Sequence, residues 1–439
     1  MEKNLVNTLF FLVASLPLVL ITGSFLPDLF VSISSIIFLY ISLKNKLWNY
    51  YNNYFFKFFI ILYIILNISS LFSVNLIVSF KTSVFYIRFI LFALSVFYLL
   101  DVKKNFEKVF FVILFFTITF LIIDGFVEHL SNRNLFSWIY FLFTSKDLYF
   151  DDNTRIQSIF IKENIFGSYL LRFSPIFFFI LMKNDLKTNY KLIYIFLILI
   201  FISIIYSGER AALILFLIFL LFNFVFMKFN IIYKFVKIFI IIFIVTLIIN
   251  LDSNLKYRYF TITKYLFYQL GTEKNIKQKQ ILEDTYPILK EYNNINNYLA
   301  LFKTSYILFS DNIIVGHGPR SFKFLSGHER FGIKEDENKI RIYFNTHPHN
   351  YYFQLLAETG ILGFCFLIFL FSISLYFCIN NFIINAKKKY SIINAQVVLF
   401  SSFFIYLWPL IVTASFFNNW VNIFHFLAVG FFLKYYYKN

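Results

Sequence analysis

The sequence predicts an all-α polytopic membrane protein with about twelve transmembrane helices, on the basis of three observations. First, 59% of its 439 residues are hydrophobic and only 14% are charged, which would leave large apolar patches on a soluble protein of this size. Second, apolar runs of about 20 residues recur, the length that spans a bilayer. Third, lysines gather between these runs, so membrane topology explains the net charge of +17 better than nucleic-acid binding does.

The predicted spans follow one another along most of the chain. They are Leu5–Ile21, Leu26–Leu43, Phe55–Phe72, Val84–Leu100, Val109–Ile123, Ile165–Met182, Leu192–Tyr206, Ala211–Met227, Tyr233–Ile249, Tyr352–Cys378, Ile392–Val412 and Asn418–Phe432. The lysines fall in alternate connections, so we expect both termini on the cytoplasmic side. The opposite side then receives Asn75–Lys81, the break at Ser207–Arg210, and two long segments, Asp124–Ile159 and Asn250–Tyr351.

Four regions follow from this pattern. They are an N-terminal transmembrane bundle (1–206), the helices after the break (207–249), an extracytoplasmic loop domain (250–351) and C-terminal transmembrane helices (352–439). Within the loop domain, Tyr298–Phe309 predicts a helix and Glu273–Asn293 has apolar residues at helical spacing. The charged, aperiodic stretch Gly327–Asn345 is expected to be a loop.

Two histidines lie where the loop domain re-enters an apolar helix. Pro348 disfavours a helical conformation for His347, and Asn350 can cap a helix that begins near Tyr351. His347 and His349 then lie at a helix N-terminus, which favours an anion. Imidazole suits proton transfer near neutrality, so the pattern fits either a general base or a hydrogen-bonded structural pair. A metal site would need further ligands, which this loop offers only at irregular spacing.

A second candidate site is the break Ser207-Gly-Glu-Arg210 between two apolar runs. Charged residues at membrane depth are costly and indicate function by default. Glu209 and Arg210 can close a tight turn as an ion pair, or Arg210 can line a cavity and bind phosphate through its planar guanidinium. Gly208 allows the chain to bend there.

A third candidate site is the turn Gly316-His-Gly-Pro-Arg-Ser-Phe322. Gly316 and Gly318 can present backbone N–H groups to an anion beside Arg320, although an ordinary solvated turn fits the same residues. Downstream, Glu358 follows His349 by about 13 Å of helix, so we expect Glu358 to pair with a buried arginine of another span.

Together these residues supply a base, phosphate-binding arginines and an opening to the outer side of a bilayer. That combination suits group transfer from a lipid-linked phosphate donor to a hydroxyl acceptor. Because no Asp-x-Asp metal motif is evident, arginines and the helix N-terminus are expected to stabilise the departing pyrophosphate without a cofactor or metal. A lipid-linked oligosaccharide transporter is the rival, but it would show paired halves with interrupted helices, which the sequence lacks.

Three motifs resemble the O-antigen ligase/polymerase superfamily of bacterial membrane glycosyltransferases. They are Ser207-Gly-Glu-Arg-Ala-Ala212, the Gly316–Phe322 turn and the stretch His347–Gly363. The resemblance implies an inner-membrane enzyme that acts in the periplasm and takes its glycan from an undecaprenyl-pyrophosphate carrier without a metal. It allows three acceptors: a lipid A core sugar (ligase), a growing glycan (polymerase) or a protein hydroxyl (oligosaccharyltransferase). Ligase-like transfer is our leading expectation, with polymerase next.

The resemblance also implies residue roles. The general base falls on His349, with His347 assisting, and pyrophosphate binding falls on Arg210. Arg320 matches a basic position found in part of the family.

The sequence departs from the family at one position. Many members carry another arginine before the Gly-x-Gly turn, where this chain reads Asn297-Tyr-Leu-Ala-Leu-Phe-Lys303. Lys303, Arg258 and Arg320 are the candidates to replace it.

Overall fold

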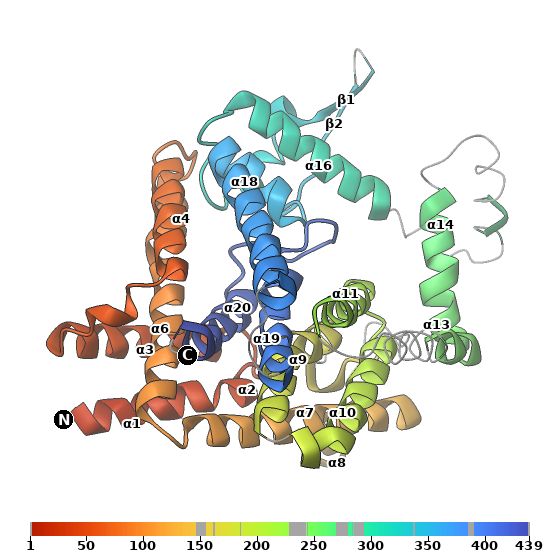
Figure 1. Ribbon diagram of the computed structural model, residues 1–439. Helices are drawn as coiled ribbons and strands as arrows, with labels where there is room; N and C mark the ends of the chain where they lie inside the picture. The colour runs from red at the N-terminus through yellow and green to blue at the C-terminus, as the bar shows by residue number, and fades with distance from the viewer. Residues whose placement is uncertain are drawn as a thin grey trace.

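The computed structural model describes residues 2–145, 155–160, 163–184, 186–227, 243, 245–268, 280–282, 284, 294–336, 339–384 and 390–437. These residues are mainly helical (Figure 1). The first half contains α1 (Glu2–Ala14), α2 (Leu16–Val19), α3 (Phe25–Lys44), α4 (Tyr54–Ser70), α5 (Leu76–Phe85), α6 (Ile87–Val102), α7 (Phe106–Ser131), α8 (Leu135–Thr144), α9 (Phe166–Asn184), α10 (Leu186–Tyr206) and α11 (Arg210–Phe226). The second half contains α13 (Ser253–Lys256), α14 (Ile262–Tyr268), α16 (Asn294–Asp311), α17 (Phe322–Leu325), the strands β1 (Ile333–Asp336) and β2 (Lys339–Arg341), α18 (Tyr351–Cys378), α19 (Tyr390–Leu407) and α20 (Asn419–Phe432).

The predicted all-α membrane class is confirmed. Among the described residues, five helical segments are long and apolar enough to cross a membrane: Phe25–Lys44, Leu76–Val102, Phe106–Ser131, Phe166–Lys183 and Tyr351–Ile383. Shorter apolar helices match further predicted spans: Tyr54–Ser70, Lys191–Tyr206, Arg210–Phe226 and Asn394–Leu407. The predicted total of about twelve stays a prediction.

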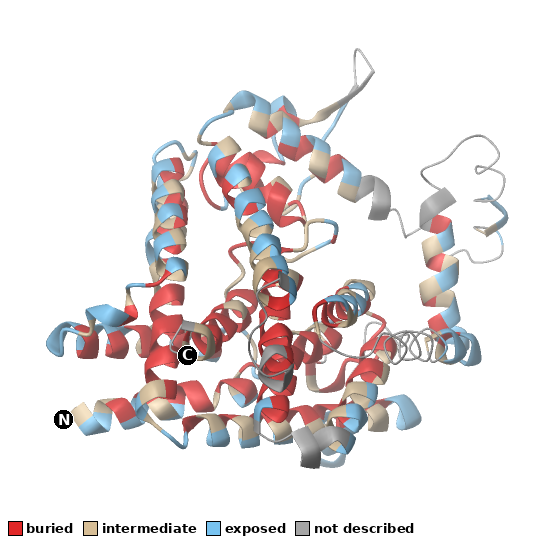
Figure 2. Ribbon diagram, viewed as in Figure 1, coloured by how far each residue is buried: buried red, intermediate tan, exposed pale blue. Residues whose placement is uncertain are grey.

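Helix α9 lies at the centre of the bundle. It packs against α7, α10, α11, α19 and α20, while α20 packs in turn on α6 and α3. Figure 2 shows buried residues concentrated on α6, α9, α19 and α20. Large phenylalanines fill this core, and the first turns of α9 are buried enough to hold polar contacts away from solvent.

Two segments that were expected on the outer side of the membrane contain helices. Asn75–Lys81 was expected to be a connection, but Asn75 caps α5 by accepting a hydrogen bond from the amide of Val78 at 3.1 Å. Helix α7 continues past its predicted end at Ile123, through the buried Asp124, whose carboxylate accepts hydrogen bonds from the Leu135 amide and the Ser158 hydroxyl. These carboxylate and amide groups have partners within the fold, so their polarity does not mark a solvent-exposed loop.

The loop domain packs on the N-terminal part of α18. Helix α16 confirms the helix predicted at Tyr298–Phe309, and it lies across α18 in Figure 1. The expectation of an irregular loop at Gly327–Asn345 is wrong in part, because β1 and β2 pair there as an antiparallel hairpin. Most of Glu273–Asn293 and of the span predicted at Tyr233–Ile249, together with the loop lysines Lys228, Lys234 and Lys387–Lys389, lies outside the described residues.

Candidate functional site

The two histidines lie side by side in the segment between β2 and α18. Their ring centroids are 4.2 Å apart. His349 has a φ of +57°, a left-handed conformation that is uncommon for residues other than glycine, and its carbonyl accepts a hydrogen bond from the amide of Thr413 at 2.8 Å. Backbone strain of this kind costs on the order of 1–3 kcal/mol and concentrates at functional sites.

The surroundings of His349 suit it to accept a proton. The Nδ2 atom of Asn345 lies 3.3 Å from Nε2 of His349, and an amide nitrogen can only donate. This contact favours the tautomer with an acceptor lone pair on Nε2 and the proton on Nδ1. Burial lowers the pKa of His349 below 6.5, and burial together with the neighbouring His349 lowers the pKa of His347 to about 4. Both shifts favour the neutral form of the imidazoles.

Asn350 fixes the histidines to two other parts of the bundle. Its side-chain oxygen accepts hydrogen bonds from the amides of Tyr352 and Phe353, as predicted for the cap of α18. Its side-chain nitrogen donates to the carbonyls of Pro409 and Ile411, in the connection between α19 and α20. The helix start and this connection therefore hold the histidine loop from both sides.

The Gly316–Phe322 turn lies directly on a kink in α18. Gly360 interrupts the helix at φ +64° and ψ −156°. The amides of His317 and Gly318 donate to the carbonyls of Ala357 and Glu358, at 3.2 and 2.7 Å. A Cβ on Gly316 would lie 2.5 Å from the backbone of Glu358, so only glycine permits this approach.

The carboxylate of Glu358 lies at the backbone N–H groups of the Gly316–Phe322 turn, where the sequence predicted an external anion. Its carboxylate accepts hydrogen bonds from the backbone amides of Arg320 and Phe322 and from the side chain of Gln354. The guanidinium of Arg320 lies close enough to interact with it electrostatically and donates to the Phe417 carbonyl at 3.1 Å. The expected partner of Glu358 is thus an arginine from the turn and not from another span. The turn's amides bind the protein's own carboxylate.

The break at Ser207–Arg210 is also arranged differently from an internal ion pair. Glu209 accepts hydrogen bonds from the amide of Gly167 at 2.6 Å and from the hydroxyl of Ser168 at 2.6 Å, so it caps the N-terminus of α9. Arg210 begins α11, and its charge acts on the neighbouring Tyr259.

Arg258 supports this break from the loop domain. Its side chain is only 1% exposed, and its Nε donates to the Gly208 carbonyl at 2.7 Å. Of the candidates for the missing family arginine, Arg258 is the one that the structure places next to Arg210. Lys303 is exposed on α16, and Arg320 lies with Glu358 and Phe417.

Helix α9 connects the break to the histidine loop. Glu209 binds the amide of Ser168, and Arg172, one turn further along the helix, hydrogen-bonds the hydroxyl of Tyr351. Four residues of helix correspond to roughly 6 Å. Tyr351 is two residues after His349, so the first two turns of α9 are in contact with both candidate regions.

Comparison with known families agrees with this geometry. Residues 195–368 match the family model described as O-antigen ligase. This part of the chain is therefore similar to the O-antigen ligase family. This match confirms the family resemblance read from the three motifs, all of which lie inside the matched residues. A search of curated proteins finds no match. The match and the apolar helices together identify a bacterial membrane protein.

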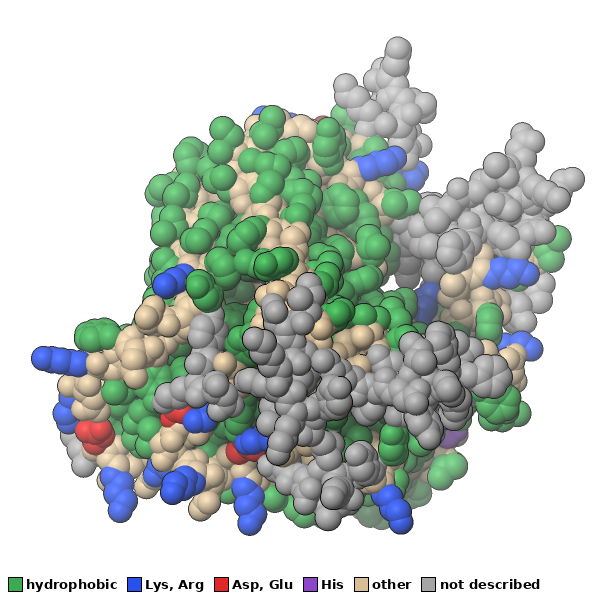
Figure 3. Space-filling model, in the orientation of Figure 1, with side chains coloured by type: hydrophobic (Ala, Val, Ile, Leu, Met, Phe, Trp, Pro, Cys, Tyr) green, Lys and Arg blue, Asp and Glu red, His purple; other side chains and the backbone are tan. Residues whose placement is uncertain are grey.

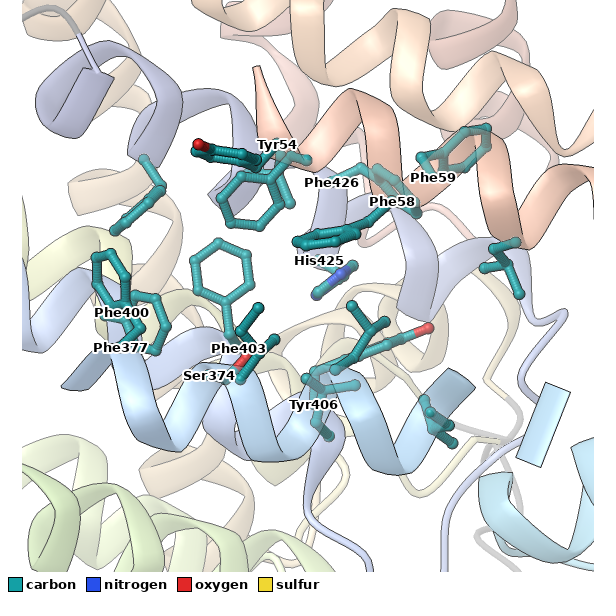
Figure 4. A pocket seen from close by; sticks show the side chains of 18 of the residues that line it. Tyr54, Phe58, Phe59, Ser374, Phe377, Phe400, Phe403, Tyr406, His425 and Phe426 are labelled. Carbon is teal, nitrogen blue, oxygen red and sulfur yellow. The ribbon is translucent and has the colours of Figure 1, made fainter. Parts of the chain in front are cut away.

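A large aromatic cavity lies at the C-terminal end of the matched residues, and Phe366 and Leu367 line it. Its volume is about 650 Å³, and its walls come from α4, α6, α18, α19 and α20 (Figure 4). Phe58, Phe403 and Phe426 line it, and His425 and Tyr406 form a polar part of the wall. The ring of Tyr406 also contacts Tyr351, at a centroid distance of 5.3 Å, so one wall of the cavity reaches the start of α18.

Sequence reasoning missed Arg172 and Tyr351. Arg172 is the one arginine within the predicted span Ile165–Met182, so its position at membrane depth was the available signal. No spacing rule links it to Tyr351, because the two residues are 179 positions apart and meet only through packing.

Proposed function

We propose that the protein transfers a glycan from an undecaprenyl-pyrophosphate carrier to a hydroxyl acceptor on the periplasmic side of the inner membrane. The observation that carries this proposal is the match of residues 195–368 to the O-antigen ligase family, a region that contains the histidine pair and the break at Ser207–Arg210, both in contact with the first turns of α9. Ligase-type transfer to a lipid A core sugar is the leading form, because the matching family is described as O-antigen ligase.

The proposed reaction is a single displacement at the anomeric carbon. Nε2 of His349 accepts the proton of the acceptor hydroxyl while the hydroxyl oxygen attacks the anomeric carbon. The bond from this carbon to the pyrophosphate oxygen breaks, and the carrier leaves as a pyrophosphate anion. His347 supports the base from 4.2 Å away, and its pKa of about 4 keeps it from adding positive charge next to His349.

The leaving pyrophosphate is stabilised by guanidinium groups in this proposal. Arg210 binds it, and Arg258 holds the break that presents Arg210. Arg320 offers a second contact, because its guanidinium has five N–H donors and one of them binds the Phe417 carbonyl. The aromatic cavity provides apolar volume for part of the carrier's isoprenoid chain.

The proposal can be tested by the glycans of a strain whose own gene is replaced by His349→Asn. Asparagine tolerates the left-handed backbone conformation of residue 349, so this change removes the imidazole with little effect on the fold. His328→Asn, an exposed histidine of the same loop domain, is the matched control.

We expect carrier-linked polymer to accumulate in the His349→Asn strain and normal surface glycan in the control. Single-repeat products in place of polymer would identify a polymerase. Normal surface glycan at a normal level of the His349→Asn protein would remove His349 from catalysis.

A further inference from the structure

A basic cleft lies at the opposite end of α9 from the candidate active site. Its volume is about 490 Å³, and the described residues that line it are Leu100, Lys103, Lys104, Glu107, Lys108, Lys183 and Tyr435. They come from the last turn of α6, the connection after it, the first turn of α7, the last turn of α9 and the C-terminal segment η7 (Leu433–Tyr437). Four lysines and one carboxylate give the cleft an excess of three positive charges.

The single carboxylate of the cleft is already engaged. Glu107 accepts a hydrogen bond from Lys183 at 2.8 Å and another from the hydroxyl of Tyr435. Lys103 binds a neutral group, the side-chain oxygen of Asn7, at 2.8 Å. Lys104 and Lys108 are exposed and have no ion-pair partner among the residues that the structure describes. Three ammonium groups around one cleft therefore lack a counter-charge from the described part of the chain.

The cleft lies at the depth of lipid headgroups. Helix α9 rises roughly 24 Å from Gly167, whose amide binds Glu209, to Lys183. This rise is close to the thickness of a bilayer's hydrocarbon core. On this side α6 ends at Val102 and α7 begins at Phe106, so the apolar helices start immediately next to the lysines. Figure 3 shows Lys and Arg side chains along the lower edge of the molecule, next to a broad hydrophobic surface.

We propose that this cleft binds the phosphate headgroup of an anionic phospholipid of the phosphatidylglycerol type from the adjacent leaflet. Lysine ammonium groups at this depth attract anionic lipid headgroups, and the exposed apolar face of α7 (Val109, Val112 and Phe116) accommodates the acyl chains. Membrane topology alone accounts for lysines on one side of the bilayer, but it does not gather four of them around one cavity. The bound lipid would join four segments of the bundle: α6, α7, α9 and η7. This site does not depend on the proposed transferase activity.

The test measures the thermal unfolding midpoint of the purified full-length protein in a neutral detergent, with added phosphatidylglycerol or phosphatidylcholine. Binding to the folded state alone raises its stability with ligand concentration. We expect phosphatidylglycerol to raise the midpoint by several degrees and phosphatidylcholine to have little effect. The double variant Lys104→Gln/Lys108→Gln should lose at least two thirds of the increase. Because both lysines are exposed, this variant is expected to fold normally.

A matched control and a soluble ligand complete the experiment. Lys46→Gln/Lys57→Gln removes the same charge at exposed positions outside the cleft and should keep the full increase. Glycerol phosphate, which lacks acyl chains, should give no increase, and an equal increase with it would show a soluble-phosphate site in place of a lipid site. An equal response to both lipids, or a response of Lys104→Gln/Lys108→Gln equal to that of the unmodified protein, would overturn the proposal.

Discussion

Glu358 is the residue whose replacement tests the structure of the candidate site most sharply. Its side chain is 0% exposed and its carboxylate accepts the backbone amides of Arg320 and Phe322 and the side chain of Gln354. A buried donor left without an acceptor costs about 1–3 kcal/mol. The two backbone amides cannot turn away, because the Gly316–Phe322 turn is hydrogen-bonded to α18. Glu358→Ala should therefore lower the free energy of unfolding by about 2–6 kcal/mol.

Glu358→Gln separates the hydrogen bonds from the charge. Glutamine keeps one acceptor oxygen but places an NH₂ group where the second oxygen accepted, so we expect a loss of about 1–3 kcal/mol. The assay is denaturant unfolding of the detergent-solubilised protein, with the exposed Glu329→Gln as a control. If both Glu358 variants unfold within about 0.5 kcal/mol of the unmodified protein, the carboxylate does not hold the turn.

Four further predictions concern the turn, the break and the two histidines. Gly316→Ala should destabilise the protein by about 3 kcal/mol or more, because the new Cβ would lie 2.5 Å from the backbone of Glu358 and residue 316 has a φ of +64°. An unchanged unfolding curve would contradict this close approach. Glu209→Gln should lower the free energy of unfolding by about 1.5–3 kcal/mol, because it weakens the charge-assisted cap on α9. Denaturant unfolding measures this loss, and a loss under about 0.5 kcal/mol would argue against the cap. The fall of kcat/KM in acidic solution should have its midpoint below pH 6.5, because burial lowers the pKa of the proposed base His349. A midpoint at or above pH 6.5 would refute this assignment of the base. Stability should fall as pH drops from 6.5 towards 4, because the unfolded chain then binds a proton at His347 that the folded chain excludes. A His347→Asn variant should show a weaker pH dependence of the free energy of unfolding, and an equal dependence in both proteins would refute this.

The parts of the fold that the sequence predicted are those that depend on local pattern. Apolar runs of membrane length identified α3, α4, α9 and α18, and the Pro-His-Asn arrangement correctly placed Asn350 as a helix cap. These features follow from neighbouring residues, so no long-range information was needed.

The parts that could not be predicted depend on contacts between distant segments. Asp124 was placed at the start of an outward segment, because its partners, Leu135 and Ser158, are known only from the folded structure. An ion pair with the neighbouring Arg210 was one of the two interpretations of Glu209, whereas the amides that Glu209 binds are about forty residues upstream on α9. An ionisable residue in an apolar run indicates that a partner exists, but the sequence does not say which one.

The most direct test of the proposed function is glycosyl transfer by the purified protein in detergent with a chelator present. An undecaprenyl-pyrophosphate glycan serves as donor and a core oligosaccharide as acceptor, and there is no second compartment into which a transporter could move the donor. General-base catalysis contributes roughly 10²–10⁴-fold, so His349→Asn should lower kcat/KM by at least 100-fold while His328→Asn leaves it unchanged. Transfer by His349→Asn within tenfold of the unmodified protein, or no transfer by the unmodified protein, would contradict this account.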